Sequence, residues 1–210
     1  MNELVIVGGG GHGRVVADAA RACGLRPVAV ADSALLGREL DGLRVLSSEP
    51  ADIAFACREL QAHVVVAIGD NASRKRIQLE LEAAGLSLAN VVHPSAVVLS
   101  GVTLGRGSVL LAGAVVGIGC QIGDGCIVNT SASVDHDSFL GAYSHLSPGV
   151  HTGGAVRVDE GAHLGVGASV RNGVAVGAWS IIGVGAAVVR DIPAGVVAYG
   201  TPARVVRAGS

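Results

Sequence analysis

The second half of the chain has a period of six residues. From Val98 to Val188 every sixth residue is aliphatic, and only Thr152 breaks the series. The residue two places earlier is always small or β-branched, and Cys120 and Cys126 both stand at such positions. A period of six fits neither an α-helix, which repeats every ~3.6 residues, nor a simple alternating strand. It predicts a solenoid in which each repeat makes one short strand and one corner, with the aliphatic side chain pointing inward.

The composition agrees with a narrow solenoid and excludes several partners. Aromatic residues make up 2% of a chain that is 50% hydrophobic, and Gly makes up 32 of its 210 residues. Glycine supplies corner conformations that a Cβ resists, while a thin column of coils has little room for Phe or Trp. A net charge of −2 without a basic block argues against nucleic acid or an anionic membrane as the main partner.

The same features predict a cytoplasmic protein. No apolar run reaches the ~20 residues of a membrane span, so we expect no membrane insertion. The N-terminus lacks the basic region of a signal peptide. The four cysteines contain no CxxC pair and imply no disulfide framework, which suits a reducing compartment.

The first ~90 residues follow a different pattern, in which apolar strands alternate with helices. We predict helices over 14–23 and 72–84, and strands over 4–7, 27–31, 44–46, 63–68 and 88–92. This order predicts a small Rossmann-like α/β domain with a parallel sheet. His93-Pro94 marks the entry to the solenoid, so we expect two domains, residues 1–90 and 91–210.

A glycine-rich loop joins the first predicted strand to the first helix. Gly8, Gly10 and Gly13 match G-x-G-x-x-G, and Asp32 follows at the spacing of a ribose-binding acid. The motif alone would suggest NAD, but no group for hydride transfer is evident. Backbone N–H groups at a helix N-terminus suit any pyrophosphate. We therefore predict a nucleotide site, with a tight turn that binds no ligand as the alternative.

Three features together resemble one family: the short Gly-rich α/β domain, the hexapeptide solenoid, and residues 129–137, whose sequence is Asn-Thr-Ser-Ala-Ser-Val-Asp-His-Asp. The chain resembles the sugar acetyltransferases typified by the bacillosamine-pathway N-acetyltransferase and the sialic acid O-acetyltransferases. The run from Asp191 to Arg204 also resembles hexapeptide acyltransferases. The resemblance implies a left-handed parallel β-helix, acetyl-CoA as co-substrate without a metal, and a homotrimer with active sites between adjacent solenoids.

The resemblance also implies roles for single residues. His136 would be the general base, because a histidine near neutral pKa suits removal of a proton from an attacking amine, with Asp137 as its carboxylate partner. Acetyl-CoA would contact four residues of the solenoid, which are His145, Gly154, Val166 and Val184. Of these, His145 would meet the acetyl carbonyl. The nucleotide sugar would contact a set drawn mainly from the α/β domain: Gly10, Gly11, His12, Asp32, Ser33, Gly69 and Asn129.

These roles predict an N-acetyltransferase acting on a nucleotide-linked amino sugar, with a 4-amino-4,6-dideoxy sugar as the expected acceptor. Which of UDP, GDP or dTDP carries it is left open. Sugar O-acetylation of the sialic acid type is the nearest alternative, since a hydroxyl would use the same base. A zinc protein of the carbonic anhydrase kind needs three histidine ligands, two of which that family pairs five residues apart; His145 and His151 are six apart. A non-catalytic sugar-nucleotide-binding scaffold is the remaining alternative.

Two further positions in the solenoid carry expectations. His163 lies 18 residues after His145, so the two rings should stack on one face if three repeats make one coil. Thr152, the polar exception in the aliphatic series, marks either a local distortion near the cofactor or simply a tolerated β-branched residue, and the second interpretation is favoured.

Overall fold

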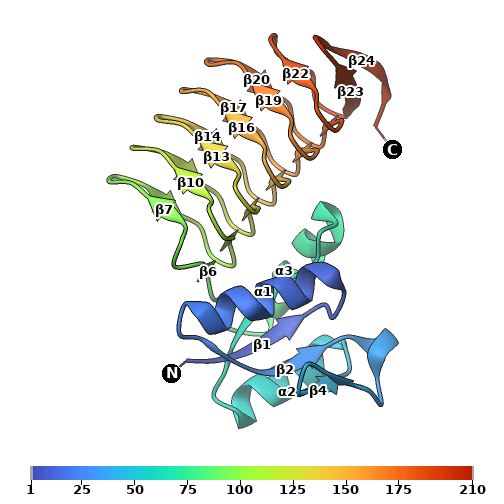
Figure 1. The fold of residues 1–210 in the computed structure, drawn as a ribbon. Helices are drawn as coiled ribbons and strands as arrows, with labels where there is room; N and C mark the ends of the chain where they lie inside the picture. The colour runs from blue at the N-terminus through green and yellow to red at the C-terminus, as the bar shows by residue number, and fades with distance from the viewer. Residues whose placement is uncertain (1, 210) are drawn as a thin grey trace. The chain divides into compact units, whose positions relative to one another are not determined.

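A computed structural model of the chain describes residues 2–209, and it divides into two compact units (Figure 1). The break lies between His93 and Pro94. The first unit is a small α/β domain and the second is a left-handed parallel β-helix, which is the fold class that the sequence predicts.

The α/β domain is built on a five-stranded sheet of order β3-β4-β2-β1-β5, parallel except for the β3–β4 pair. Its helices are α1 (Gly11–Ala22), α2 (Pro50–Glu59) and α3 (Asn71–Ala83), with a short 3-10 turn η1 (Ser33–Leu35). The strands of this sheet are β1 (Glu3–Val7), β2 (Arg26–Ala31), β3 (Glu39–Leu40), β4 (Leu43–Leu46) and β5 (His63–Val66). The short strand β6 (Val91–Val92), at the end of the unit, belongs to a different sheet.

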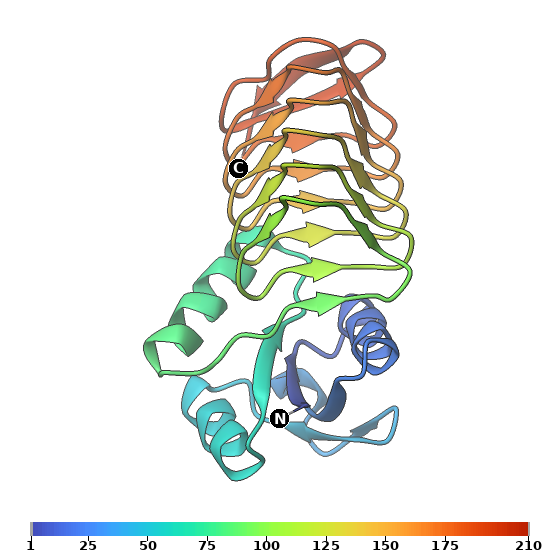
Figure 2. The ribbon, with the colours of Figure 1, turned by 90° about the vertical axis from the view of Figure 1, so that its left-hand side faces the viewer.

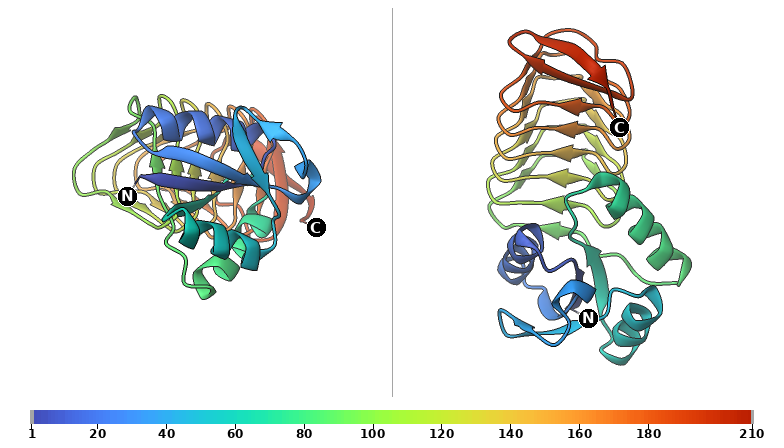
Figure 3. Two further views of the ribbon diagram at one scale, coloured as in Figure 1. Left: turned by 90° about the horizontal axis from the view of Figure 1, so that it is seen from below. Right: turned by 90° about the vertical axis from the view of Figure 1, so that its right-hand side faces the viewer.

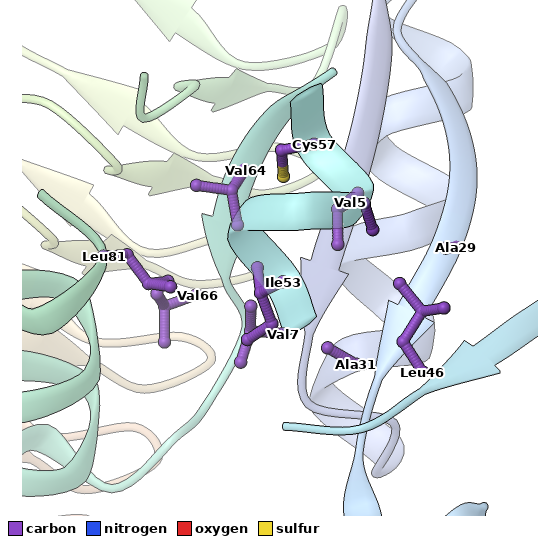
Figure 4. Packing of buried hydrophobic residues seen from close by; sticks show 11 residues of the cluster. Val5, Val7, Ala29, Ala31, Leu46, Ile53, Cys57, Val64, Val66 and Leu81 are labelled. Atoms are coloured by element: carbon purple, nitrogen blue, oxygen red, sulfur yellow. The ribbon is translucent and has the colours of Figure 1, made fainter. Parts of the chain in front are cut away.

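The core of this domain follows from the alternation of side chains along its central strands. Val5 and Val7 of β1 point to one face, where they join Val64 and Val66 of β5 in a fully buried cluster (Figure 4). Ile53 of α2 and residues of β2, β4 and α3 complete the cluster. Strand β1 lies between β2 and β5, so its carboxyl end, and the glycine-rich loop that follows, lie between the carboxyl ends of these two strands.

Three features of the α/β domain differ from the sequence prediction, the first being the short strand β3, which was not predicted. Helix α2 has no counterpart in the prediction, because Phe55 faces solvent with 64% of its surface exposed and blurs the apolar period of the helix. The predicted strand over 88–92 is wrong as a single strand, since Leu88 makes only an isolated bridge to Val64 and regular pairing resumes at β6.

The β-helix consists of three parallel sheets whose strands stack coil upon coil (Figure 2). The first sheet contains β7 (Val97–Val98), β10 (Val115–Val116), β13 (Ser133–Val134), β16 (His151–Thr152), β19 (Ser169–Val170) and β22 (Ala187–Val188). The second contains β8 (Thr103–Leu104), β11 (Gln121–Ile122), β14 (Phe139–Leu140), β17 (Arg157–Val158) and β20 (Ala175–Val176). The third contains β9 (Val109–Leu110), β12 (Ile127–Val128), β15 (His145–Leu146), β18 (His163–Leu164) and β21 (Ile181–Ile182).

The register confirms that three hexapeptides make one coil. Ile127 pairs with His145, and His145 pairs with His163, so each residue lies beside the residue 18 positions later. The aliphatic side chains of the repeat fill the column, with Leu140, Leu146 and Leu164 completely buried. At the C-terminus the third sheet continues into β23 (Val196–Gly200) and its antiparallel partner β24 (Ala203–Ala208), which Figure 3 shows at one end of the coils.

The corners of the coils adopt left-handed backbone conformations at a regular spacing. From residue 101 to residue 185, every sixth residue has a positive φ, and most of these residues are glycines. The other residues in this series are Ser131, Asp137, Tyr143, Ala155 and Trp179. A side chain in this conformation costs about 1–2 kcal/mol relative to glycine. The non-glycine corners are therefore the places to look for side chains with a function.

Candidate functional site

His136 lies at the corner between β13 and β14, in contact with the residue that follows it. Its Nδ1 is 2.9 Å from the Asp137 Oδ2, and more than half of each side chain is exposed. A carboxylate can only accept a hydrogen bond, so Nδ1 carries the proton and donates it. The lone pair of neutral His136 is therefore on Nε2, which is the nitrogen that can take a proton from a substrate.

The charges around His136 favour its protonated form. The hydrogen bond that His136 donates to Asp137 raises the pKa of His136, and the charge of Asp135 raises it further. Asp135 also contacts this corner directly, because its Oδ1 accepts the backbone N–H of His136 at 2.8 Å. Both acids stabilise an imidazolium, so the site is suited to a base that is charged after it has removed a proton.

Asp137 occupies a left-handed corner with φ 56°. The residues one coil before and two coils after are Gly119 and Gly173, with φ 71° and 69°. Glycine would fit this corner more cheaply, and strained side chains cluster at functional sites because their chemistry is needed there. The corner one coil later is also not a glycine, since Ala155 has φ 54°, so the hydrogen bond and not the backbone conformation identifies Asp137 as the partner of His136.

Gly154 provides the space for the His136 ring. It lies one coil later, and a Cβ on it would come within 2.5 Å of Cε1 and still closer to Nε2 of that ring. The backbone of Gly154 is not left-handed. The glycine is therefore required for space and not for conformation.

Thr152 alters the β-ladder beside His136. Between β13 and β16 only Ser133 and His151 pair regularly, whereas the next pair of strands is joined through both of its residues. The backbone N–H of Asp135 instead points at the Thr152 Oγ1, at 3.3 Å. Thr152 is buried. It thus marks a local distortion, and the favoured interpretation of a merely tolerated residue is wrong.

A second group of polar side chains lies on the third sheet. Asn129 Nδ2 is 3.1 Å from Nε2 of His145, and that ring stacks on His163 with centroids 4.7 Å apart and planes 14° from parallel. The Ser147 hydroxyl lies 2.9 Å from His163 Nε2. The predicted stacking of the two histidines is confirmed. The structure also brings Asn129 against His145, although the sequence analysis assigns them to different ligands.

The remaining predicted cofactor contacts are exposed apolar side chains on the corners of later coils. Val166 has 49% and Val184 has 76% of its surface exposed. Both are available to an apolar part of a ligand, and their contact with acetyl-CoA stays a prediction.

The α/β domain contains a pocket of about 410 Å³ at the carboxyl ends of its central strands. Of the predicted substrate residues in this domain, all but Ser33 line it: Gly10, Gly11, His12, Asp32 and Gly69. Ser33 instead contacts Ser48, with their hydroxyl oxygens 2.6 Å apart, and Ser48 itself lines the pocket. Ser48 was not predicted as a pocket residue, because nothing in the local sequence pattern shows that the segment before α2 approaches η1.

The glycine-rich loop is shaped for the close approach of an anion. Gly8 has φ 106°, and a Cβ on Gly13 would overlap the Gly8 carbonyl oxygen. No atom lies within 4 Å of where a Cβ on Gly10 or Gly11 would stand. The loop therefore leaves the N-terminus of α1 open toward the pocket, as a phosphate site requires.

Asp32 fastens this loop to the end of β2. One carboxylate oxygen accepts the N–H of Gly9 at 2.9 Å, and the other accepts the N–H of Ala34 at 3.0 Å. Both oxygens thus have backbone partners. Asp32 lines the pocket as predicted, and in addition it holds the loop in place.

His12 is neutral in the folded protein. Burial, and secondly the nearby Arg74 guanidinium, lower the pKa of His12 to about 4. Arg74 is itself buried and braces the loop after β5, since it donates to the Ile68 and Asn71 oxygens at 2.8 and 2.7 Å. The pocket is therefore lined by an uncharged imidazole, while the buried Arg74 guanidinium lies behind the loop that follows β5 and not on the pocket wall.

Two properties of residues 2–209 bear on the alternatives. No three histidine, cysteine, aspartate or glutamate side chains in this range are grouped so that they could hold a metal ion. Within the same residues, no helix combines the length and apolar character needed to cross a membrane.

Comparison with known proteins places these features in context. Residues 3–81 match the PglD N-terminal domain. The UDP-N-acetylbacillosamine N-acetyltransferase of Bacillus subtilis (strain 168) is 39% identical over 114 residues, which are 53% of this chain and 52% of that enzyme. The chain thus matches about half the length of this curated relative.

Two solved structures match over nearly the whole chain. The acetyltransferase domain of PglB from Neisseria gonorrhoeae FA1090, in complex with acetyl coenzyme A, is 37% identical with a TM-score of 0.92, covering 98% of this chain and 99% of that one. A histidine variant of perosamine N-acetyltransferase from Caulobacter crescentus, in complex with CoA and GDP-perosamine, is 42% identical with a TM-score of 0.93, covering 98% and 97%.

Proposed function

Because the chain belongs to the sugar N-acetyltransferase family that includes the PglB acetyltransferase domain and perosamine N-acetyltransferase, we propose that it transfers the acetyl group of acetyl-CoA to the amino group of a nucleotide-linked amino sugar. The observation that carries this proposal is the His136–Asp137 pair, exposed at a corner of the β-helix with its lone pair on Nε2.

In this reaction the amine nitrogen attacks the carbonyl carbon of the thioester, and the nitrogen becomes positively charged. His136 Nε2 removes a proton from that nitrogen, and the bond between carbon and sulfur breaks. The products are an amide and CoA, whose sulfur receives the proton. Asp137 keeps the ring oriented and stabilises the imidazolium that forms between the two proton transfers.

His145 and the nucleotide pocket supply the other parts of the proposal. His145 meets the acetyl carbonyl, while Gly154, Val166 and Val184 contact the cofactor. In the α/β domain the pyrophosphate binds at the open N-terminus of α1, and Gly10, Gly11, His12 and Gly69 hold the nucleotide sugar. Asn129, Asp32 and Ser33 belong to the same proposed substrate contacts, the last of them acting through Ser48.

The acceptor we propose is a 4-amino-4,6-dideoxy sugar attached to a nucleoside diphosphate. Two relatives support this acceptor. The perosamine N-acetyltransferase is described in complex with GDP-perosamine, and the relative from Bacillus subtilis is named UDP-N-acetylbacillosamine N-acetyltransferase. The pocket of about 410 Å³ is within the range of small-molecule sites. The backbone N–H groups at the open N-terminus of α1 fit a negatively charged diphosphate better than a free sugar.

We also propose a homotrimer in the cytoplasm. His136 lies at the corner after β13, whereas Asn129 lies at the corner before β13, so one flat face of the prism separates them. A neighbouring prism that brings its own Asn129 corner to His136 would join the two groups in one site. The four cysteines are free thiols, which suits the reducing cytoplasm.

An acceptor panel tests this proposal. Purified protein is incubated with acetyl-CoA and the 4-amino sugars of UDP, GDP and dTDP, with free sialic acid as an O-acetylation control, and each product is weighed by mass spectrometry. We expect one nucleotide amino sugar to gain an acetyl group. Acetylation of sialic acid alone would favour the O-acetyltransferase alternative, and no transfer to any acceptor would favour a binding scaffold.

A further inference from the structure

The hydrogen bond between Asn129 and His145 has a direction that the structure determines. Asn129 follows β12, and His145 opens β15, the next strand of the same sheet. The backbone N–H of Thr130 points at one side-chain atom of Asn129, at 2.8 Å. A backbone N–H can only donate, so this atom is the amide oxygen. The other atom, which faces His145 Nε2 at 3.1 Å, is therefore the NH₂ group.

This direction fixes where His145 carries its proton. An NH₂ group can only donate, so the ring nitrogen opposite it must accept. An accepting Nε2 has no proton, and in a neutral imidazole the proton is then on Nδ1. An imidazolium would place an Nε2–H against the NH₂ of Asn129, with two donors facing each other.

The surroundings of the ring also disfavour a positive charge. Only 7% of the His145 surface is exposed. In the ladder it lies between Ile127 and His163, and it stacks on the His163 ring. Burial disfavours the charged form of a histidine, and two stacked rings cannot both be charged without repulsion.

We propose that Asn129 is a positioning residue that holds His145 as a neutral imidazole with its proton on Nδ1. The inference rests on the proposed function, in which His145 meets the acetyl carbonyl. The two histidines then divide the chemistry. His136 removes the proton from the amine, whereas His145 donates a hydrogen bond from Nδ1 as negative charge develops on the carbonyl oxygen.

Nuclear magnetic resonance of the uniformly ¹⁵N-labelled full-length protein tests the proton position directly. Two-bond correlations between ring protons and ring nitrogens identify the tautomer, and loss of the signals in His145→Gln assigns them. We expect a protonated Nδ1 and a bare Nε2 at neutral pH. A proton on Nε2 would overturn the proposal.

Asn129→Asp tests whether Asn129 is responsible. Aspartate keeps an oxygen for the Thr130 N–H but places a second acceptor opposite Nε2, so we expect the proton to move to Nε2. At saturating substrates and alkaline pH, kcat should fall about 10²-fold, the usual effect of losing one donor to the developing oxyanion. The loss of kcat relative to the wild type should become smaller as the pH falls, because the doubly protonated His145 ring of the variant regains its Nδ1–H.

A purely structural effect of Asn129→Asp would lower kcat by the same factor at every pH, and that result, or an unchanged His145 spectrum, would contradict the proposal. Ser133→Ala is the matched control, because the Ser133 hydroxyl lies 2.8 Å from His151 Nδ1 across one coil. It should change the His151 signals and leave those of His145 unaltered. If the wild type acetylates no acceptor, the proposed function fails, yet the ring signals still decide where the proton is.

Discussion

Replacing Gly154 by alanine should misplace the His136 ring while leaving the fold intact. The new methyl carbon would lie within 2.5 Å of Cε1 of that ring, whereas ordinary carbon contacts lie at roughly 3.5–4.0 Å. The ring must therefore move by about 1 Å or more. The clash is with the end of an exposed side chain and the Gly154 backbone is not left-handed, so the free energy of unfolding should change by no more than about 0.5 kcal/mol.

The effect on catalysis should be much larger. A displacement of about 1 Å at a catalytic group can lower the rate about 10²-fold. We therefore expect kcat of Gly154→Ala, measured as release of the CoA thiol at saturating substrates, to fall by about that factor. In a His136→Ala background, with acetyl-CoA saturating for each variant, the same change should lower kcat less than about twofold, because the group it displaces is gone and a weakened cofactor contact would raise KM instead. A Gly154→Ala enzyme with normal kcat, or a further large loss in the double variant, would refute this account of Gly154.

Three more predictions concern pH and the ladder. Asparagine in Asp137→Asn tolerates the left-handed corner, but its neutral amide weakens the hydrogen bond with His136 Nδ1, which is the main cause of the raised His136 pKa. The acidic limb of the kcat/KM profile should therefore move to lower pH while the maximum falls at least about tenfold; an unmoved limb would contradict it. Because the folded-state pKa of His12 is lowered to about 4, the α/β domain should lose stability as the pH falls from about 6.5 to about 4, by about 2 kcal/mol at pH 5. Urea unfolding, monitored through the circular dichroism signal of the helices, should show this loss of stability in the wild type and not in His12→Gln. Thr152→Val removes the acceptor of the Asp135 N–H; we expect the regular ladder to form, stability to hold within about 0.5 kcal/mol, and kcat to fall because the His136 corner moves, whereas an unchanged kcat would show that the distortion is unimportant.

Much of the fold could be predicted because each six-residue repeat corresponds to one strand and one corner of a coil. The period predicts inward aliphatic side chains, and the 18-residue coil predicts the stacking of His145 on His163, both of which the structure confirms. The same spacing places Gly154 beside His136, so the contact could have been anticipated. Its consequence could not, because only coordinates show that the ring fills the space where a Cβ would stand.

Other features depend on contacts that no local pattern records. Helix α2 was not predicted, because the exposed Phe55 blurs its apolar period. The contact of Ser48 with Ser33 depends on how two loops meet. The distortion at Thr152 follows from a competition between a hydroxyl and a carbonyl for one N–H group, which the sequence shows only as a single break in a period. The side chains to which we assign the chemistry, those of Asn129, His136 and Asp137, stand at positions that the period does not require.

The central claim is that His136 is the base of an acetyl transfer to a nucleotide-linked amino sugar. The most direct measurement is the rate of acetylation of the preferred acceptor by wild type and His136→Ala, with the product identified by mass. The account predicts acetylated sugar nucleotide from the wild type and a loss of about 10²- to 10⁴-fold in the variant. Equal rates for the two proteins would contradict it.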